Sequence, residues 1–230
     1  MNINRRNIFL ALLCVQFSGA VWSQQTYQVG LLPAINLNSK LENDWSLNTK
    51  LESRQLLQGG LWNDSVIEDY NYVLTDLSLV AAKKVGLNGK IAGGYLVRLE
   101  NGEFIHRIIQ QYTTVQRKSG YRLAHRFLAD QTISRIERPT FRLRYRLTAE
   151  IPLNGESVDM KEFYVKLNNE YVNSLQANVY DLEIRLIPLL GFGINDRHKI
   201  ELGLDYRVNS LFNNNTRQSF WTTLNWYIEM

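Results

Sequence analysis

The clearest pattern in the chain is a strict alternation of apolar and polar positions between Pro139 and Ile151. Every second residue from Phe141 onward is apolar, and the residues between them include three arginines and one glutamate. Successive side chains of a strand point to opposite faces, whereas a helix would scatter these arginines around its whole surface. The segment is therefore predicted to be a β-strand with one apolar face and one charged face.

The same period of two recurs around Trp45, Ile91, Phe163 and Asp181, and from 198 to 208. Turn signals rich in Asn and Gly separate these segments, at residues 42–44, 88–89, 101–102, 119–120, 154–155, 195–196 and 213–215. Asn and Gly tolerate the positive φ angles that tight hairpins require. The faces of 69–84 and 104–118 cannot be assigned, because both faces of these two segments are mixed.

About eleven strand-like segments can be counted in this way. Single-chain outer-membrane barrels normally have an even number of strands, with both termini on the periplasmic side. We therefore expect ten or twelve strands, and interpret 29–36, which Pro33 interrupts, as two short strands or none.

The alternation predicts an all-β protein, an antiparallel up-and-down transmembrane β-barrel of about 10–12 strands. Strands of ten or more residues match the tilted span of a bilayer. Many aromatic residues lie near segment ends, where a membrane barrel places its aromatic girdles: Trp45, Tyr70, Tyr72, Tyr112, Tyr121, Tyr164, Tyr171, Tyr206, Trp221 and Trp226. A soluble lipid-binding barrel also has alternating strands, but its apolar face would line the interior. That alternative stays open.

The first 23 residues are typical of a secretory signal peptide. Arg5 and Arg6 precede an apolar run over residues 8–15, and Val21 and Ser23 suit the −3 and −1 positions of a cleavage site. The apolar run is too short to span a bilayer as a helix. We expect residues 1–23 to be removed and residues 24–230 to form the barrel in the outer membrane of a Gram-negative cell. Cys14 follows a leucine rather than a small residue, so acylation is not expected.

The composition limits the classes of partner that can be expected. Without residues 1–23, the remaining chain has 24 basic and 22 acidic residues, a formal net charge of +2, and no cysteine. It has no basic tract followed by aromatic platforms, so no nucleic-acid partner is expected. No long apolar run follows the signal, which argues against membrane-spanning helices. The expected partners are outer-membrane lipid and the outer-membrane assembly machinery; the sequence does not determine the oligomeric state.

Charged residues of alternating sign occupy the polar face of three neighbouring predicted strands, and an inward orientation would bring them together in the lumen. They are Arg122, Arg126, Asp130, Arg142, Arg144, Arg146, Glu150, Glu162, Lys166 and Glu170. Buried charge is tolerated when it is paired, which favours an ion-pair network that fills the interior. The alternative is an arginine stripe that selects anions or recognises phosphate or carboxylate groups.

Catalytic chemistry is poorly represented. Of the three histidines, only His106, beside the Asn101-Gly102 turn and Glu103, is a candidate base, and no second catalytic residue can be named. Metal-ligand spacing and a phosphate-binding glycine loop are absent, so no metal and no cofactor are expected. We predict a non-enzymatic barrel with a structural, binding or narrow-channel role. A hydrolase that modifies lipid or the envelope is the alternative, and a soluble periplasmic lipid-binding barrel is the third possibility.

Several short motifs add a resemblance. They are Leu32-Pro33-Ala34-Ile35-Asn36-Leu37, Leu51-Glu52-Ser53-Arg54-Gln55, His125-Arg126-Phe127, Leu143-Arg144-Tyr145-Arg146 and Asn168-Asn169-Glu170. In these the chain resembles an uncharacterised family of small bacterial outer-membrane β-barrels that is known only as a domain of unknown function. The resemblance implies the barrel and its location, and it implies no catalytic residues.

Overall fold

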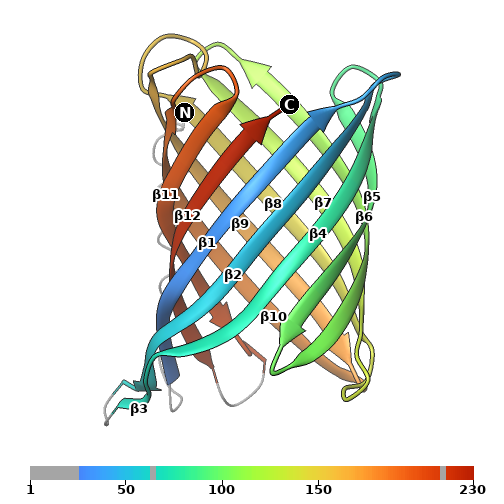
Figure 1. The fold of residues 1–230 in the computed structure, drawn as a ribbon, viewed down its shortest axis with the longest axis vertical. Helices are drawn as coiled ribbons and strands as arrows, with labels where there is room; N and C mark the ends of the chain where they lie inside the picture. The colour runs from blue at the N-terminus through green and yellow to red at the C-terminus, as the bar shows by residue number, and fades with distance from the viewer. Residues whose placement is uncertain (1–25, 63–65, 213–215) are drawn as a thin grey trace, which may run out of the picture.

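The computed structural model describes residues 26–62, 66–212 and 216–230, so the predicted signal peptide lies outside the described residues. The described part is a barrel of tilted strands (Figure 1). The strands are β1 (Thr26–Lys40), β2 (Trp45–Leu61), β3 (Val66–Glu68), β4 (Asn71–Val85), β5 (Gly89–Glu100), β6 (Glu103–Lys118), β7 (Tyr121–Ile133), β8 (Thr140–Pro152), β9 (Phe163–Gln176), β10 (Val179–Gly193), β11 (His198–Asn209) and β12 (Arg217–Glu229). The described residues contain no α-helix with the length and hydrophobicity of a transmembrane span.

The barrel closes through β1, which pairs with β2 on one side and with β12 on the other. All neighbours are antiparallel except β1 and β12, which run in the same direction. The three-residue β3 pairs only with β2 among the described strands, so the closed ring contains eleven. The predicted β-barrel of about 10–12 strands is confirmed. The expectation of an even number is wrong: an up-and-down ring of eleven must end in the direction in which it began, which forces a parallel seam.

The parallel seam also separates the two ends of the described chain. Thr26 begins β1 and pairs with Arg217, the first residue of β12, at one end of the barrel. Lys40 and Glu229, the last residues of these strands, lie at the opposite end. The expectation that both termini lie on one side therefore does not hold for the described residues.

Pro33 does not divide the first strand, and the interpretation of 29–36 as two short strands or none is wrong. Pro33 lies within β1 on its exposed face, where the register with β2 has no partner between Leu31 and Ala34. A proline removes one ladder hydrogen bond and is tolerated where the ladder is already interrupted. On the other side, β1 keeps continuous register with β12, and this pairing carries the strand through the proline.

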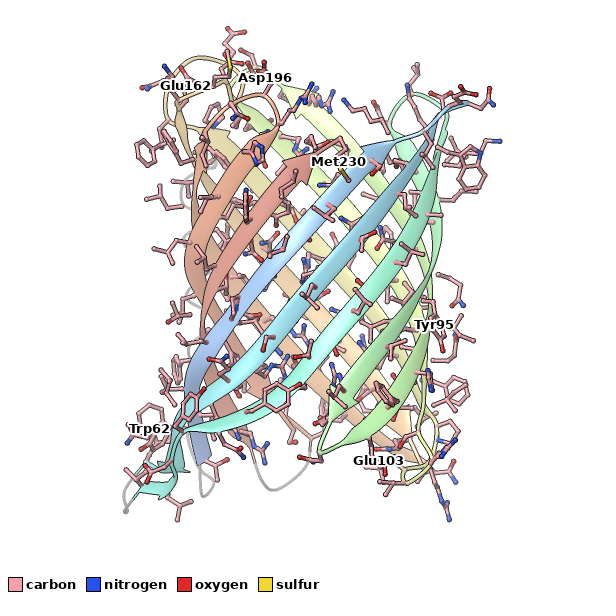
Figure 2. All side chains as sticks on the ribbon, in the orientation of Figure 1. Trp62, Tyr95, Glu103, Glu162, Asp196 and Met230 are labelled. Carbon is pink, nitrogen blue, oxygen red and sulfur yellow. The ribbon has the colours of Figure 1, made fainter. Side chains whose placement is uncertain are left out.

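The two faces of the strands have opposite chemistry. Apolar side chains point outward, as Leu143 (66 % exposed) and Leu202 (54 % exposed) illustrate, and most charged side chains of the strands point into the barrel (Figure 2). Glu170 and Asp130 are 0 % and 1 % exposed. This facing is the reverse of the one that a soluble lipid-binding barrel requires, in which the apolar face would line the interior.

Some inward positions are apolar, which explains why two segments gave no clear pattern. Leu74 on β4 is 1 % exposed, and Ile109 on β6 packs inside the barrel with Leu96 and Leu128. A barrel of this width is filled partly by side chains, and these include hydrophobic ones. The alternation along 69–84 and 104–118 is blurred for that reason.

Two of the residues expected in an outer aromatic girdle lie inside instead. Tyr164 and Trp221 are 2 % and 3 % exposed and point inward, whereas Trp45, Tyr72 and Tyr112 are exposed on the outer surface. Each inward ring lies against a glycine on the neighbouring strand, Tyr164 against Gly191 and Trp221 against Gly30. A Cβ atom at either glycine would collide with the ring, so glycine is what lets these rings pack against the wall.

Candidate functional site: a basic cavity inside the barrel

The interior contains a cavity of about 720 Å³. Its lining extends from Lys40, Ser46 and Lys90, close to one end of the barrel, to Asn209, the last residue of β11, toward the other end. The lining is strongly basic, with thirteen lysines and arginines and five aspartates and glutamates. The cavity is therefore a polar, positively charged space that follows much of the length of the barrel.

One wall of the cavity is built from a row of charged residues on five successive strands. Arg126 on β7 is the ladder partner of Arg146 on β8, which is the partner of Glu170 on β9. The row continues to Arg185 on β10 and Arg207 on β11. The period of two turns each of these side chains inward, and the hairpin registers align them at one level.

Glu170 is the centre of this wall. Its buried carboxylate accepts hydrogen bonds from the Nη2 atoms of Arg126 (3.0 Å), Arg144 (3.0 and 3.1 Å) and Arg146 (2.9 Å). Arg185 Nη1 lies 3.4 Å from the same carboxylate and also pairs with Glu183. A charge without solvent contact is costly unless it is paired, and here four guanidinium groups surround one carboxylate.

A second buried carboxylate, Asp130, organises the neighbouring part of the wall. Arg142 donates to it from Nε at 2.7 Å, and Arg107 Nε lies 3.5 Å away. Arg144 Nη1 is 3.8 Å from Asp130, so Arg144 links the two carboxylates. Thr132 accepts hydrogen bonds from both Arg107 and Arg142, which holds the two guanidinium groups beside each other.

Other charges inside the barrel are matched more evenly. Arg98 binds Asp76 in a bidentate pair at 2.7 and 2.8 Å, and Arg207 binds Asp205 at 3.0 and 2.6 Å. Glu201 accepts hydrogen bonds from Lys166 (2.7 Å), from Tyr164 and from the Tyr227 hydroxyl. These pairs leave little unbalanced charge, so the positive excess of the cavity comes from the wall around Glu170 and Asp130 and from other lining cations such as Lys40, Arg54 and Lys90.

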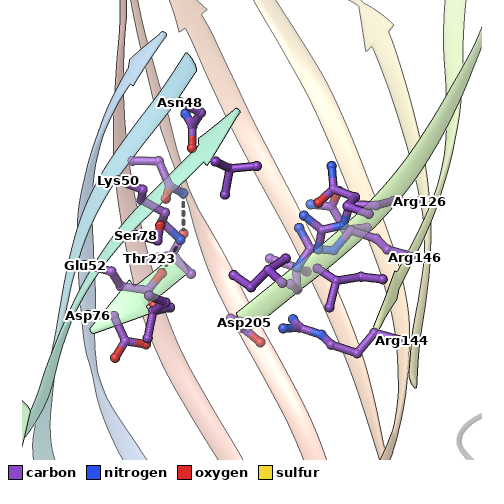
Figure 3. A pocket seen from close by; sticks show the side chains of 18 of the residues that line it. Asn48, Lys50, Glu52, Asp76, Ser78, Arg126, Arg144, Arg146, Asp205 and Thr223 are labelled. Carbon is purple, nitrogen blue, oxygen red and sulfur yellow. Dashed lines mark hydrogen bonds and ion pairs between the residues drawn. The ribbon is translucent and has the colours of Figure 1, made fainter. Parts of the chain in front are cut away.

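The arginines that share Glu170 retain unused hydrogen-bond donors. The Nε atoms of Arg126, Arg144 and Arg146 are buried and have no hydrogen-bond partner among the described residues. Each of these side chains lines the cavity and is 14–26 % exposed. Figure 3 shows the three arginines on one side of the cavity, facing Asn48, Lys50 and Ser78 on the other.

An apolar cluster lies toward the end where β1 begins. Trp221 packs with Leu32 and Leu56, and the Arg54 guanidinium lies 5.1 Å from the Trp221 ring centroid. Trp221 is the ladder partner of Gly30, five residues into β1. This cluster fills part of the interior, so the lumen is narrower there than an empty ring of eleven strands would be.

The charged residues predicted from the sequence have four different environments in the structure. Arg126, Asp130, Arg142, Arg144, Arg146 and Glu170 meet in the wall described above, and Lys166 pairs with Glu201 instead. Arg122 and Glu150 form a separate pair at 3.1 Å, in which Arg122 is 37 % exposed. Glu162 precedes β9 near the rim and forms no ion pair with another described residue. The structure thus contains both an ion-pair network and an unfilled cavity.

Several charged residues that point into the barrel were not predicted from the sequence as part of the lumen network. Arg107, Arg185 and Glu183 belong to the arginine-rich wall, and Asp76, Arg98, Glu201, Asp205 and Arg207 form the other pairs. For Arg98, Glu183, Arg185, Glu201, Asp205 and Arg207 the signal was present, because each alternates with apolar residues on its own strand. Asp76 and Arg107 lie on the two irregular strands, where no face could be assigned.

The histidines lie apart from this cavity. His106 Nδ1 is 2.6 Å from the Tyr95 hydroxyl and His125 Nδ1 is 2.9 Å from the Tyr145 hydroxyl, both on the outer surface. His198, at the start of β11, accepts a hydrogen bond from Trp226 at 3.3 Å. Within the described part of the chain, no group of three His, Cys, Asp or Glu side chains is arranged to hold a metal.

These features define the class of protein: a closed β-barrel with an apolar outer surface and a polar, charged lumen. A family model described as "Protein of unknown function (DUF2490)" matches residues 29–219, and the chain belongs to this family. The resemblance found in the short motifs is confirmed as far as the family is concerned, and the outer-membrane location it implied stays a prediction. No curated protein and no solved structure matches the chain significantly.

Proposed function

We propose that this protein is an outer-membrane β-barrel with a non-enzymatic role, whose narrow, basic lumen admits small anionic solutes. The observation that carries the proposal is the division of faces: apolar side chains outside, and an interior cavity lined by thirteen basic and five acidic residues. An outward apolar band is what lipid requires of a membrane barrel. A charged constriction of one sign favours ions of the opposite sign.

The dimensions support a membrane span. The eleven strands of the ring contain 12 to 17 residues, and a tilted transmembrane strand needs about 9–11. Exposed aromatic residues such as Trp45 and Tyr72 lie close to strand ends, where they would meet the headgroup region. The proposed partners are accordingly outer-membrane lipid and the assembly machinery that inserts such barrels, after export by the predicted signal peptide.

The alternative functions have less support. A hydrolase needs a nucleophile or water held beside a base that a third group orients. His106 is hydrogen-bonded to the Tyr95 hydroxyl on the outer surface, and not to a carboxylate that could orient it as a base. A soluble lipid carrier would need an apolar interior, whereas the cavity here is lined mainly by charged and polar groups. A purely structural barrel of this width is expected to be filled by its own side chains, whereas this one contains an unfilled cavity.

Two measurements test the proposal in sequence. Cell fractionation followed by gel electrophoresis with and without boiling should give recovery in the outer membrane and a shift on heating. Purified barrel in a planar bilayer with a KCl gradient should then give a reversal potential that indicates chloride permeation over potassium. Recovery in the soluble periplasm would refute the location, and a sealed or cation-selective barrel would refute the role of the lumen.

A matched pair of variants on β4 sharpens the conductance test. Ser78 lines the cavity, and Leu79, the next residue, is 50 % exposed on the outer surface. Ser78→Trp should lower conductance because the indole occupies the lumen, and Leu79→Trp should leave it unchanged. Equal conductance in both variants would mean that ions do not pass through this cavity.

A further inference from the structure

The wall around Glu170 has more positive charge than its own carboxylates can balance. Arg185 has a partner of its own in Glu183, so Arg126, Arg144 and Arg146 depend mainly on Glu170. Three guanidinium groups against one carboxylate leave an excess of two positive charges. Asp130 reduces this excess little, because it lies 3.8 Å from Arg144 and is already shared by Arg107 and Arg142.

The geometry leaves this excess facing the cavity. All three arginines use Nη2 for Glu170, which lies behind them and is fully buried. All three side chains line the cavity and are 14–26 % exposed, so the parts of the guanidinium groups that Glu170 does not cover face the lumen. Arg126 and Arg146 are moreover direct ladder partners, so a single oxyanion in the cavity could contact both guanidinium groups.

We propose that Arg126, Arg144 and Arg146 form a binding site for a small solute with two negative charges, held through a phosphate group or a pair of carboxylates. Guanidinium groups bind both kinds of oxyanion through paired, charge-assisted hydrogen bonds. The two charges of the solute match the excess of two on the wall. This inference rests on the proposed function, because it names the class of solute that the basic lumen would hold.

The opposite wall suits the remainder of such a solute. Asn48, Lys50 and Ser78 face the three arginines across the cavity (Figure 3). An amide and a hydroxyl can donate to or accept from neutral polar groups, and Lys50 is already paired with Glu52. The site is therefore asymmetric, with a strongly anion-binding side and a nearly neutral polar side.

The test is calorimetric titration of the full barrel, folded in detergent at low salt, with inorganic phosphate and with succinate. Saturable binding of either anion supports the site, and the pattern identifies the chemistry: phosphate alone, dicarboxylate alone, or both. Absence of binding by both, in protein that still shifts on heating, would overturn the inference. Because heat modifiability and cellular location are measured separately, failure here is distinguishable from failure of the proposed function.

Two variants distinguish binding at the three arginines from attraction by the overall positive charge of the lumen. Arg146→Gln should weaken binding by about tenfold or more, because it removes a charged donor from the site. Lys90→Gln removes the same charge from the lining of the same cavity, outside the arginine wall, and should change affinity by about twofold or less. Equal losses in the two variants would show that only the overall charge of the lumen matters, and would overturn the proposed site.

A measurement on the unmodified sequence protects the test against variants that fail to fold. Phenylglyoxal modifies accessible arginines, and peptide mass spectrometry locates the products. Phosphate or succinate should protect Arg126, Arg144 and Arg146 while leaving the modification of Arg122, which lies in a separate pair, unchanged. Equal protection at Arg122, or protection nowhere, would contradict a site at the three arginines.

Discussion

Arg126 and Arg146 are direct partners across the β7–β8 ladder, and both donate to the Glu170 carboxylate, at 3.0 and 2.9 Å. Two like charges in such a pair repel each other. Glu170, the next residue of the same row, compensates for the repulsion because it lies within hydrogen-bond distance of both. The stability of this wall should therefore depend on one buried carboxylate more than on any single arginine.

Glu170→Gln should destabilise the barrel strongly. The substitution leaves four guanidinium groups around a neutral amide, and breaking a buried charge cluster in this way costs about 3–5 kcal/mol. Urea unfolding of the detergent-folded protein, followed by tryptophan fluorescence, would measure the loss. Glu150→Gln is the matched control: its partner Arg122 is 37 % exposed, so the expected loss is about 1 kcal/mol or less. Similar losses in the two variants would contradict a central role for Glu170.

An arginine should be tolerated at residue 78 and not at residue 79. Leu79→Arg places a charge on the apolar outer surface, which costs about 2–4 kcal/mol near the middle of a bilayer. Ser78→Arg directs the same side chain into the polar cavity, where space is present. The yield of heat-modifiable protein in membranes should fall for Leu79→Arg and remain near that of the parent for Ser78→Arg. A reversed order would mean that the faces are assigned incorrectly.

Gly191→Ala should destabilise the barrel although it adds a single methyl group. The new Cβ would collide with the Tyr164 ring, which is held by a hydrogen bond to Glu201 at 2.8 Å. Overpacking of this kind typically costs about 1–3 kcal/mol. Gly93→Ala adds the same methyl group where no other atom lies within 4 Å, so its effect should stay within about 0.5 kcal/mol. Thermal unfolding of the two variants side by side measures the difference.

The parallel seam can be tested by cross-linking. Ala34 and Asn225 are ladder partners on β1 and β12, so the double variant Ala34→Cys/Asn225→Cys should form a disulfide on mild oxidation. Cysteine-specific mass mapping would identify the bond, and Cys14 is replaced by serine to remove the background. Ala34→Cys/Ser219→Cys should not cross-link, because the partner of Ser219 is Gln28, about 20 Å away along the strand. A cross-link in the second pair alone would exclude the observed register.

The strands themselves were largely predictable from the sequence. The alternation from Pro139 to Ile151 corresponds closely to β8, and the Asn and Gly turn signals within the described residues lie at or next to the ends of strands, where Asn43, Asp44 and Asn101 have positive φ. The turn predicted at 213–215 lies outside the described residues. Local alternation suffices there, because the preference of each residue for a pleated surface and the pattern of the two faces agree. The predictions failed at Pro33 and at the parity of the strand number. Both are decided by pairing with strands remote in the sequence.

The sequence by itself determined that the protein is built of β-strands with one apolar and one charged face, and that arginine dominates the charged face. Only the tertiary structure decided which face is inside, that eleven strands close with a parallel seam, and that Arg126, Arg146, Glu170 and Arg185 lie in one row. The reason is physical. A period of two is a local property of the backbone, whereas ring closure and cross-strand register depend on contacts between segments that the sequence places far apart.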